Sequence, residues 1–378
     1  MFHFKTLIRR MMAMAMVPYK KQFIPLFSDH YIEPLNHFQS LPKTPLSIGG
    51  IRNLDAPLVQ PLSTRSLEAK YFRFPVESII DNSITDFDLF ADVGSHVILY
   101  SGNGYKWVRS ELAGLIDNGY EHFWIRPEDS SKAAIYEKMA KLPVISRELK
   151  PEDRLQNIQD IGATFTKYLF EGEITESTMR KAQELALGVV ECVQEDPGCI
   201  KAITGLANHD AYTYLHSIRV SAYATAIAVQ MGLSKSDALQ QIALGGIFHD
   251  VGKSSVPMEI INKTGPLLEA EWLLMKSHPT EGIKKIEDSC LHHVSREIVL
   301  HHHERLNGSG YPHALTKDSL LPEVQIATLA DVFDALTSSR SYQNKRNRFE
   351  ALDFIKHRLL RTDIAVEPFK ALIECLVK

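Results

Sequence analysis

Cysteine is scarce in this chain of 378 residues. The four cysteines, Cys192, Cys199, Cys290 and Cys375, lie far apart, and none forms a CxxC pair. Secreted disulfide frameworks and thiolate zinc sites both depend on closely spaced cysteines. Neither kind of site is therefore expected.

Long hydrophobic runs are also missing. No apolar stretch reaches the length of about 18 residues that a membrane-spanning helix needs. The run Met11–Val17 follows Arg9 and Arg10, as in a secretory leader. It is short, however, and Lys20 and Lys21 follow it without a small-residue cleavage site. We therefore expect a cytoplasmic protein with no membrane span.

A surplus of positive charge is absent as well. Lysine and arginine number 42 against 46 aspartates and glutamates, which gives a net charge of −4. Proteins that bind nucleic acid normally carry a basic footprint, so no nucleic-acid partner is expected. A small phosphorylated ligand is compatible with this balance, because one local group of cations is enough to hold it.

The chain divides into four predicted segments, in keeping with roughly 100–200 residues per domain. Residues 1–65 are interrupted by prolines and predict an extended or poorly ordered leader. Residues 66–130 predict a small α/β module, which we interpret as regulatory, and residues 131–198 a helical connector. Residues 199–378 are predominantly helical. The predicted fold class is mainly α, with a helical domain C-terminal to a small α/β module.

Individual elements follow from periodicity and from breaker residues. The predicted strands are Tyr71–Val76, Phe87–Ala91, His96–Tyr100 and His122–Ile125, with a short helix over Ser110–Asn118. Helices are then predicted over Pro151–Phe170 and Thr175–Cys192, and over about 211–231, 235–249, 268–277, 279–288, 292–302, 322–340 and 348–358.

Histidine is abundant where cysteine is not. Of the 16 histidines, nine fall between His209 and His303. The imidazole ring is the commonest side-chain metal ligand, so this segment is the first place to look for a site.

Five groups of imidazole and carboxylate lie on or beside apolar helices. They are His216, the pair His249–Asp250, His278, the triplet His301–His303, and Asp331. Each alone is compatible with a hydrogen-bonded core residue. Burying an unpaired carboxylate is very costly, and either lysine or arginine partners or a divalent metal could offset that cost. One cluster of metal ions would satisfy all five groups together.

The residue types indicate which metals and which chemistry. Mixed imidazole and carboxylate ligands suit iron, manganese, zinc or nickel better than calcium or magnesium. A carboxylate such as Asp250 can bridge two metals about 3.5–4 Å apart, which lower the pKa of a shared water, supply hydroxide near neutral pH and neutralise phosphate charge. Lys253 could hold a phosphate oxygen as a point charge.

Two runs carry a family resemblance. The run HDVGK at 249–253 and the run HHERLNGSGYP at 302–312 resemble the HD-GYP subgroup of the HD phosphohydrolase superfamily. Supporting pieces are Tyr212–Ser217, His278–Gly282 and Asp331–Arg340, so that the resemblance spans about residues 200–345. It implies an all-α HD-GYP catalytic domain at 199–378 that hydrolyses cyclic di-GMP.

The resemblance also implies roles for particular residues. The metal ligands would be His216, His249, Asp250, His278, His302, His303 and Asp331, with Asp250 as the bridge and His301 outside the pattern. Lys253 and Arg340 would hold substrate phosphates, and Asp250 and Lys253 would be the catalytic residues. Gly308, Gly310 and Tyr311, in the GYP loop 308–312, would line the substrate and contact partners such as GGDEF-type signalling proteins. The two glycines permit backbone conformations closed to other residues, and a homodimer is compatible with the resemblance.

Three positions depart from the family pattern. Tyr212 replaces the glutamate of members with three metals. Because a phenol is a poor ligand for a divalent cation, we expect two metals, iron or manganese, and linear pGpG as the main product, with further cleavage to GMP left open. Asn307 replaces a common aspartate with little expected effect. Gln343 replaces a cation, which weakens the hold on the second phosphate.

The expected activity is a phosphodiesterase that uses a metal-bridging hydroxide. The alternative is a weak or inactive receptor that binds a cyclic dinucleotide or a partner protein. Cyclic GMP-AMP as the substrate also stays open.

Overall fold

The computed structural model describes residues 70–81, 83–93, 96–143, 145–203, 212–338 and 346–377. The leader expected at 1–65 and the expected phosphate ligand Arg340 lie outside these residues. The described residues divide into two compact units. One holds the residues between 70 and 83, 89–102 and 106–126; the other holds 84–88, 103–105 and the chain from 127 onward. The domain boundaries drawn from the sequence stay predictions.

The first unit is built on an antiparallel sheet with strand order β1-β6-β3-β4. Its strands are β1 (Phe72–Pro75), β3 (Leu89–Val93), β4 (His96–Ser101) and β6 (His122–Ile125), and α3 (Arg109–Asp117) belongs to the same unit. Aromatic side chains form its core, with Phe123 and Trp124 buried. Two further strands, β2 (Ile84–Thr85) and β5 (Tyr105–Lys106), pair as a separate short sheet.

The second unit is helical. Its α-helices are α4 (Ser130–Ala140), α5 (Pro151–Glu171), α6 (Glu176–Glu195), α7 (Tyr212–Gln230), α8 (Ser236–Phe248), α9 (Met258–Ile261), α10 (Glu269–Lys276), α11 (His278–Lys285), α12 (His293–His301), α13 (Pro322–Thr337), α14 (Arg348–Arg358) and α15 (Val366–Val377). Short 3-10 turns connect them, among them η5 (Val251–Ser255) directly after α8.

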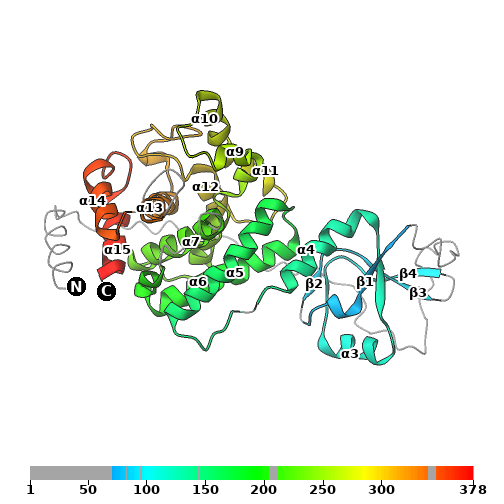
Figure 1. The fold of residues 1–378 in the computed structure, drawn as a ribbon. Coiled ribbons are helices and arrows are strands. Elements are labelled where there is room, and N and C mark those ends of the chain that lie inside the picture. The colour runs from blue at the N-terminus through cyan, green and yellow to red at the C-terminus, as the bar shows by residue number, and fades with distance from the viewer. Residues whose placement is uncertain are drawn as a thin grey trace. The chain divides into compact units, whose positions relative to one another are not determined.

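Helix α7 is the centre of this unit (Figure 1). Every residue from His216 to Ala228 is buried, as expected for a helix that is apolar or small on all sides. The alanines at 222, 224, 226 and 228 allow the helices α5, α6, α8, α13 and α15 to pack around it. His216 is consequently held in the interior, where its ring needs polar partners.

The predicted fold class is confirmed, and most predicted helices begin and end within a few residues of the observed ones. The helix predicted at 348–358 matches α14 at both ends. Helix α15 was not predicted. Pro368 lies in its first turn, where a proline is tolerated because the backbone N–H it lacks would have no partner within the helix.

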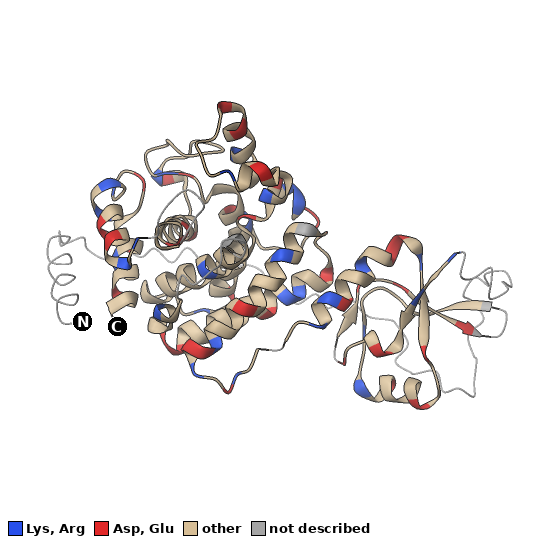
Figure 2. Cartoon of the chain, in the orientation of Figure 1, with Lys and Arg blue, Asp and Glu red and all other residues tan. Residues whose placement is uncertain are grey.

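Charged side chains of both signs are intermixed along the helices in the view of Figure 2, in keeping with the small net charge of the chain. Among the described residues, none of the helices combines the length and the apolar character needed to cross a bilayer.

Candidate metal centre

All seven predicted ligands lie in the helical unit and come together from five helices and their ends. His216 lies on α7, His249 and Asp250 follow α8, His278 opens α11, His302 and His303 follow α12, and Asp331 lies on α13. His303 is the most exposed of them, with 19% of its side chain accessible. The structure thus gathers these side chains into one buried cluster, while their roles as ligands stay a prediction.

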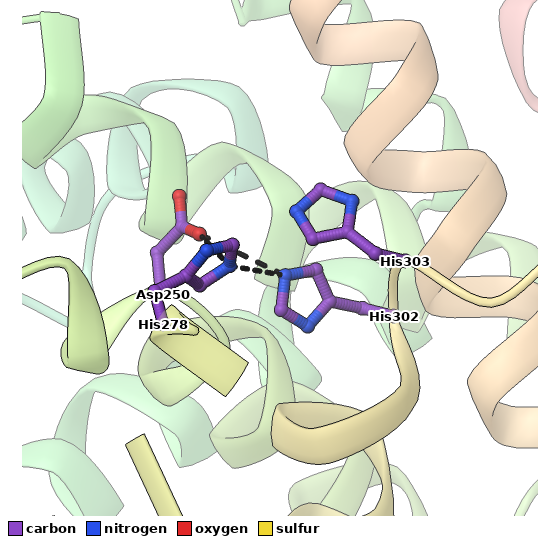
Figure 3. A group of neighbouring side chains, drawn as sticks. All are labelled: Asp250, His278, His302 and His303. Atoms are coloured by element: carbon purple, nitrogen blue, oxygen red, sulfur yellow. Dashed lines mark hydrogen bonds and ion pairs between the residues drawn. The ribbon is translucent and has the colours of Figure 1, made fainter. Parts of the chain in front are cut away.

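Four of these residues form a first group: Asp250, His278, His302 and His303 (Figure 3). One candidate ligand atom from each lies within 4.8 Å of the others. The Oδ1 atom of Asp250 lies 3.3 Å from Nε2 of His278 and 3.7 Å from Nε2 of His302. This group has the size of a single ion's coordination sphere.

The other three residues, His216, His249 and Asp331, form a second group within the same distance limit. Nε2 of His216 lies 3.1 Å from Oδ1 of Asp331. The second oxygen of Asp250, Oδ2, faces this group, at 3.3 Å from Nε2 of His249 and 3.6 Å from Nε2 of His216. Asp250 therefore has one oxygen directed at each group, which is the arrangement that a bridging carboxylate needs.

Backbone carbonyl groups fix the orientation of three of the imidazole rings. Nδ1 of His249 donates to the carbonyl of Gly246 at 2.8 Å, and Nδ1 of His278 to that of Met275 at 2.7 Å. His302 donates in the same way to the carbonyl of Val299 at 3.0 Å. These bonds place the proton on Nδ1 and leave Nε2 of each ring available as a ligand atom.

The resulting donor set fits divalent cations. Nε2 of His278 lies 3.2 Å from Nε2 of His302, and Nε2 of His249 lies 3.3 Å from Nε2 of His216. Two nitrogen lone pairs at such distances repel each other unless a proton or a cation lies between them. Oδ1 of Asp250 is also buried without a hydrogen-bond donor among the described residues. A cation at each group would relieve both conditions.

The electrostatics keep the carboxylates ionised. Burial opposes ionisation of Asp250 and Asp331, but the neighbouring imidazoles, joined at Asp250 by Lys253, outweigh it and hold the pKa of both carboxyls well below the usual value. Burial raises the energy of a protonated imidazole and lowers the pKa of His278 to about 3. Burial lowers the pKa of His302 and His303 as well, so the first group presents the ionised carboxylate and the neutral imidazoles that metal ions bind.

His249 departs from this pattern. Burial lowers its pKa, but the adjacent charge of Asp250 outweighs burial, so the pKa of His249 is raised. A raised pKa favours protonation of Nε2, so a cation at this group would compete with a proton for that atom.

A buried pair behind His216 was not assigned a role from the sequence. Nδ1 of His216 donates to Oδ2 of Asp334 at 2.7 Å, and the Arg219 guanidinium donates to both oxygens of Asp334. Burial raises the pKa of Asp334, but Arg219 and His216 outweigh it and lower the pKa to about 2. The spacing could have indicated this pair, because Asp334 lies three residues after Asp331 and Arg219 three after His216, on the same helix faces.

The predicted phosphate ligand Lys253 lies in η5, beside the cluster. Its Nζ donates to Oδ2 of Asp250 at 2.6 Å, and 18% of its side chain is exposed. The ammonium group thus neutralises part of the charge of Asp250 and still reaches solvent, where an anionic ligand would meet it.

The GYP loop closes one side of the cluster. The Tyr311 ring stacks on that of His303, with centroids 4.8 Å apart. Gly308 adopts a left-handed conformation with φ of +75°, as expected. At position 310, glycine was expected to be needed for a backbone conformation closed to other residues, and this expectation was wrong. Its φ is not positive, but a side chain there would collide with the backbone of His303, Glu304 and Arg305, so close packing is what requires glycine.

Glu304 anchors this loop, a role that sequence reasoning missed. Its buried carboxylate accepts the backbone N–H of His313 at 2.7 Å and that of Leu315 at 3.0 Å. His301, expected outside the pattern, indeed points elsewhere, toward Glu297 and His313.

Replacing Glu304 by glutamine is expected to loosen the loop. An amide offers one oxygen to the two N–H groups, and its NH₂ faces one of them. Because hydrogen bonds to a charged group contribute about 1.5–3 kcal/mol, the loss should increase proteolysis between 305 and 316. Limited proteolysis with mass spectrometry measures this, with Glu287→Gln as an exposed control. Equal cleavage of both variants would contradict the anchoring role.

Comparisons with known proteins identify the same region. Residues 202–366 match the protein family described as HD domain. The cyclic di-GMP phosphodiesterase PA4108 of Pseudomonas aeruginosa is 36% identical over 174 residues, which are 45% of this chain and 41% of that protein. The 3'3'-cGAMP-specific phosphodiesterase 1 of Vibrio cholerae is 33% identical over 148 residues, which are 39% of this chain and 34% of that protein. The chain therefore spans less than half the length of these two curated relatives.

A solved structure shares the fold. The protein Bd1817 of Bdellovibrio bacteriovorus, described as an HDG"Y"P protein, aligns with a TM-score of 0.52 at 19% identity. The alignment covers 81% of this chain and 99% of that one.

Proposed function

We propose that this chain, whose residues 202–366 match the HD domain family, belongs to the HD-GYP group of that family and is a phosphodiesterase that hydrolyses cyclic di-GMP. The observation that carries the proposal is the convergence of seven imidazole and carboxylate side chains into two adjoining groups joined by Asp250. Relatives that act on cyclic dinucleotides, as their names state, support the choice of substrate class.

An HD domain with this cluster binds divalent metal. We propose two ions, iron or manganese, one at each group. The predominance of imidazole nitrogens favours these metals over calcium and magnesium. When bound, such ions lower the pKa of water and stabilise the charge that builds up on the phosphate.

The residues of the chain supply positioning and charge. Asp250 directs one carboxylate oxygen at each group. The backbone carbonyls of Gly246 and Met275 hold the His249 and His278 rings in place. Lys253 has its ammonium group at the same carboxylate, from which it can also reach a phosphate oxygen of the substrate. Tyr311 shields His303 from water on the loop side.

The proposed reaction opens the ring of the substrate. The oxygen of water forms a bond to one phosphorus, the bond from that phosphorus to the ribose O3′ breaks, and O3′ takes up a proton. The product is linear pGpG. Two ions rather than three are proposed because Tyr212 stands where three-metal members have a carboxylate. The phosphate-binding role of Arg340, the partners of the GYP loop, a homodimer and a cytoplasmic location stay predictions.

Removing the metal is expected to abolish turnover. Purification without oxygen prevents oxidation of ferrous iron, and dialysis against EDTA should then stop hydrolysis of cyclic di-GMP, since the ligand set alone provides no ionised water near neutral pH. Manganese or ferrous iron should restore it at two ions per chain. Chromatography of the products with metal analysis measures both quantities.

Two outcomes would count against this account. Intact cyclic di-GMP after incubation with protein that holds manganese or iron would contradict the proposed activity. GMP as the sole product would contradict the proposal of two ions while leaving the activity in place.

A further inference from the structure

A row of aromatic rings leads away from the candidate metal centre. The His303 ring stacks on Tyr311 at an interplanar angle of 26°. Tyr311 in turn meets the ring of Trp272, with centroids 6.5 Å apart and the planes at 72°. Trp272 lies on α10, outside every motif of the sequence. The row therefore connects a candidate metal ligand to a tryptophan on the surface.

Trp272 differs from the other tryptophans of the chain. Trp107 and Trp124 are buried in the first unit, whereas Trp272 is 44% exposed. Its ring and that of Tyr311 form a T-shaped pair, and its exposure leaves ring surface accessible to solvent. Nucleobases stack on open aromatic faces of this kind, and the interaction tolerates any base because every base has a π face.

The ammonium group of Lys276 lies close to the rings of Trp272 and Tyr311. Nζ of Lys276 lies 5.5 Å from the Trp272 centroid and 5.6 Å from the Tyr311 centroid. Lys276 is only partly exposed, and no carboxylate of the described residues lies within 4.0 Å of its Nζ. The ammonium group of Lys276 therefore has no acidic partner among those residues to neutralise it. Beside a metal centre proposed to bind phosphate, such a charge attracts an anion. Lysine also pairs with the acceptors O6 and N7 of guanine.

We propose that Trp272, Lys276 and Tyr311 form a purine subsite that holds one guanine of the dinucleotide next to the reacting phosphate. The base stacks on Trp272, and Lys276 donates to its O6 or N7. This inference rests on the proposed function. Leu268, Leu273 and other apolar residues near Trp272 in the sequence are also exposed. Such a surface could instead contact a second copy of this chain. The continuity of the rings with His303 favours the nucleotide.

Tryptophan fluorescence tests the stacking directly. Because Trp107 and Trp124 are buried in the other unit, Trp272 is the tryptophan that a ligand at this subsite would quench. GMP should quench the emission of the full-length, metal-loaded protein, whereas ribose 5-phosphate, which has no base, should not. The quench should vanish in Trp272→Phe. An undiminished quench in that variant, or none in the wild type, would overturn the subsite.

Kinetics with cyclic di-GMP provide the second test. Trp272→Ala should raise KM about 5- to 150-fold, the range expected for one lost base stack, with a smaller effect on kcat. Trp272→Phe should recover most of the loss. Lys276→Met should reduce the preference for cyclic di-GMP over cyclic di-AMP. Leu273→Ala, at the exposed next position of α10, is the matched control and should leave KM unchanged.

The possible results separate the subsite from the proposed function. Quenching by GMP without hydrolysis of any cyclic dinucleotide would support the guanine subsite and refute the phosphodiesterase. Hydrolysis with the same KM in wild type and Trp272→Ala would overturn the subsite alone. Equal effects of Trp272→Ala and Leu273→Ala on the dimer fraction in size-exclusion chromatography, with unchanged KM, would assign the surface to self-association and overturn the subsite.

Discussion

Replacing Asp250 by asparagine is expected to reduce hydrolysis of cyclic di-GMP by about 10³-fold or more. This carboxylate has one oxygen directed at each of the two groups, so its loss would affect both of the proposed ions. Metal ions contribute several kcal/mol of charge stabilisation in the transition state, and each 1.36 kcal/mol corresponds to about tenfold in rate. Asparagine keeps the shape of the side chain but lacks the charge.

The measurement combines initial rates with metal analysis of the same sample. The variant should contain clearly less metal than the wild type, because the bridging charge is gone. Asp318→Asn, at an exposed position after the GYP loop, should keep full metal content and full activity. Wild-type rates in Asp250→Asn would rule out the bridge and the mechanism built on it.

Replacing Asp334 by alanine should weaken both stability and metal binding. Asp334 and Arg219 are each 1% exposed and directly paired, and breaking a buried pair by removing one partner costs about 3–5 kcal/mol. His216 also loses the acceptor that fixes its ring. Loss of such an outer partner typically costs about 10- to 100-fold in metal affinity or activity.

A double variant separates the two effects. In Arg219→Met with Asp334→Leu, both charges are absent, so the free energy of unfolding of the metal-free protein should recover toward the wild-type value. Metal affinity should stay low, because His216 still lacks its acceptor. Urea unfolding and metal titration measure these quantities. An unchanged urea midpoint for Asp334→Ala would show that the ion pair does not stabilise the fold.

The clustering of these seven side chains could be predicted from the sequence because buried carboxylates and imidazoles need partners. Asp331 on an apolar helix and the HDVGK run are costly to bury alone, and that cost indicates a shared cation. Which of these side chains lie in the same group could not be predicted, because spacing along the chain does not determine which helices pack together. The division into a group around His278 and a group around His216 depends on how α11, α12 and α13 meet α7 and α8.

Other features carried a weaker signal or none. Asp334 and Arg219 each lie three residues after a proposed ligand, so helix geometry alone could have indicated them. Glu304 is part of the HHE run, but its hydrogen bonds to His313 and Leu315 depend on a loop conformation that no periodicity reveals. Trp272 lies on a short helix without a motif. It becomes a candidate binding residue only because the structure places it beside Tyr311.

The wide separation of His216 from Asp334, 118 positions along the chain, has a consequence for biosynthesis. Translation proceeds at about 5–20 residues per second, so the ribosome needs several seconds to extend the chain from α7 to α13. During that interval His216 has neither its carboxylate acceptor nor its neighbour Asp331. Stable binding of the ion proposed for the second group would therefore wait until α13 has left the exit tunnel, so the proposal places metal acquisition late in the maturation of this protein.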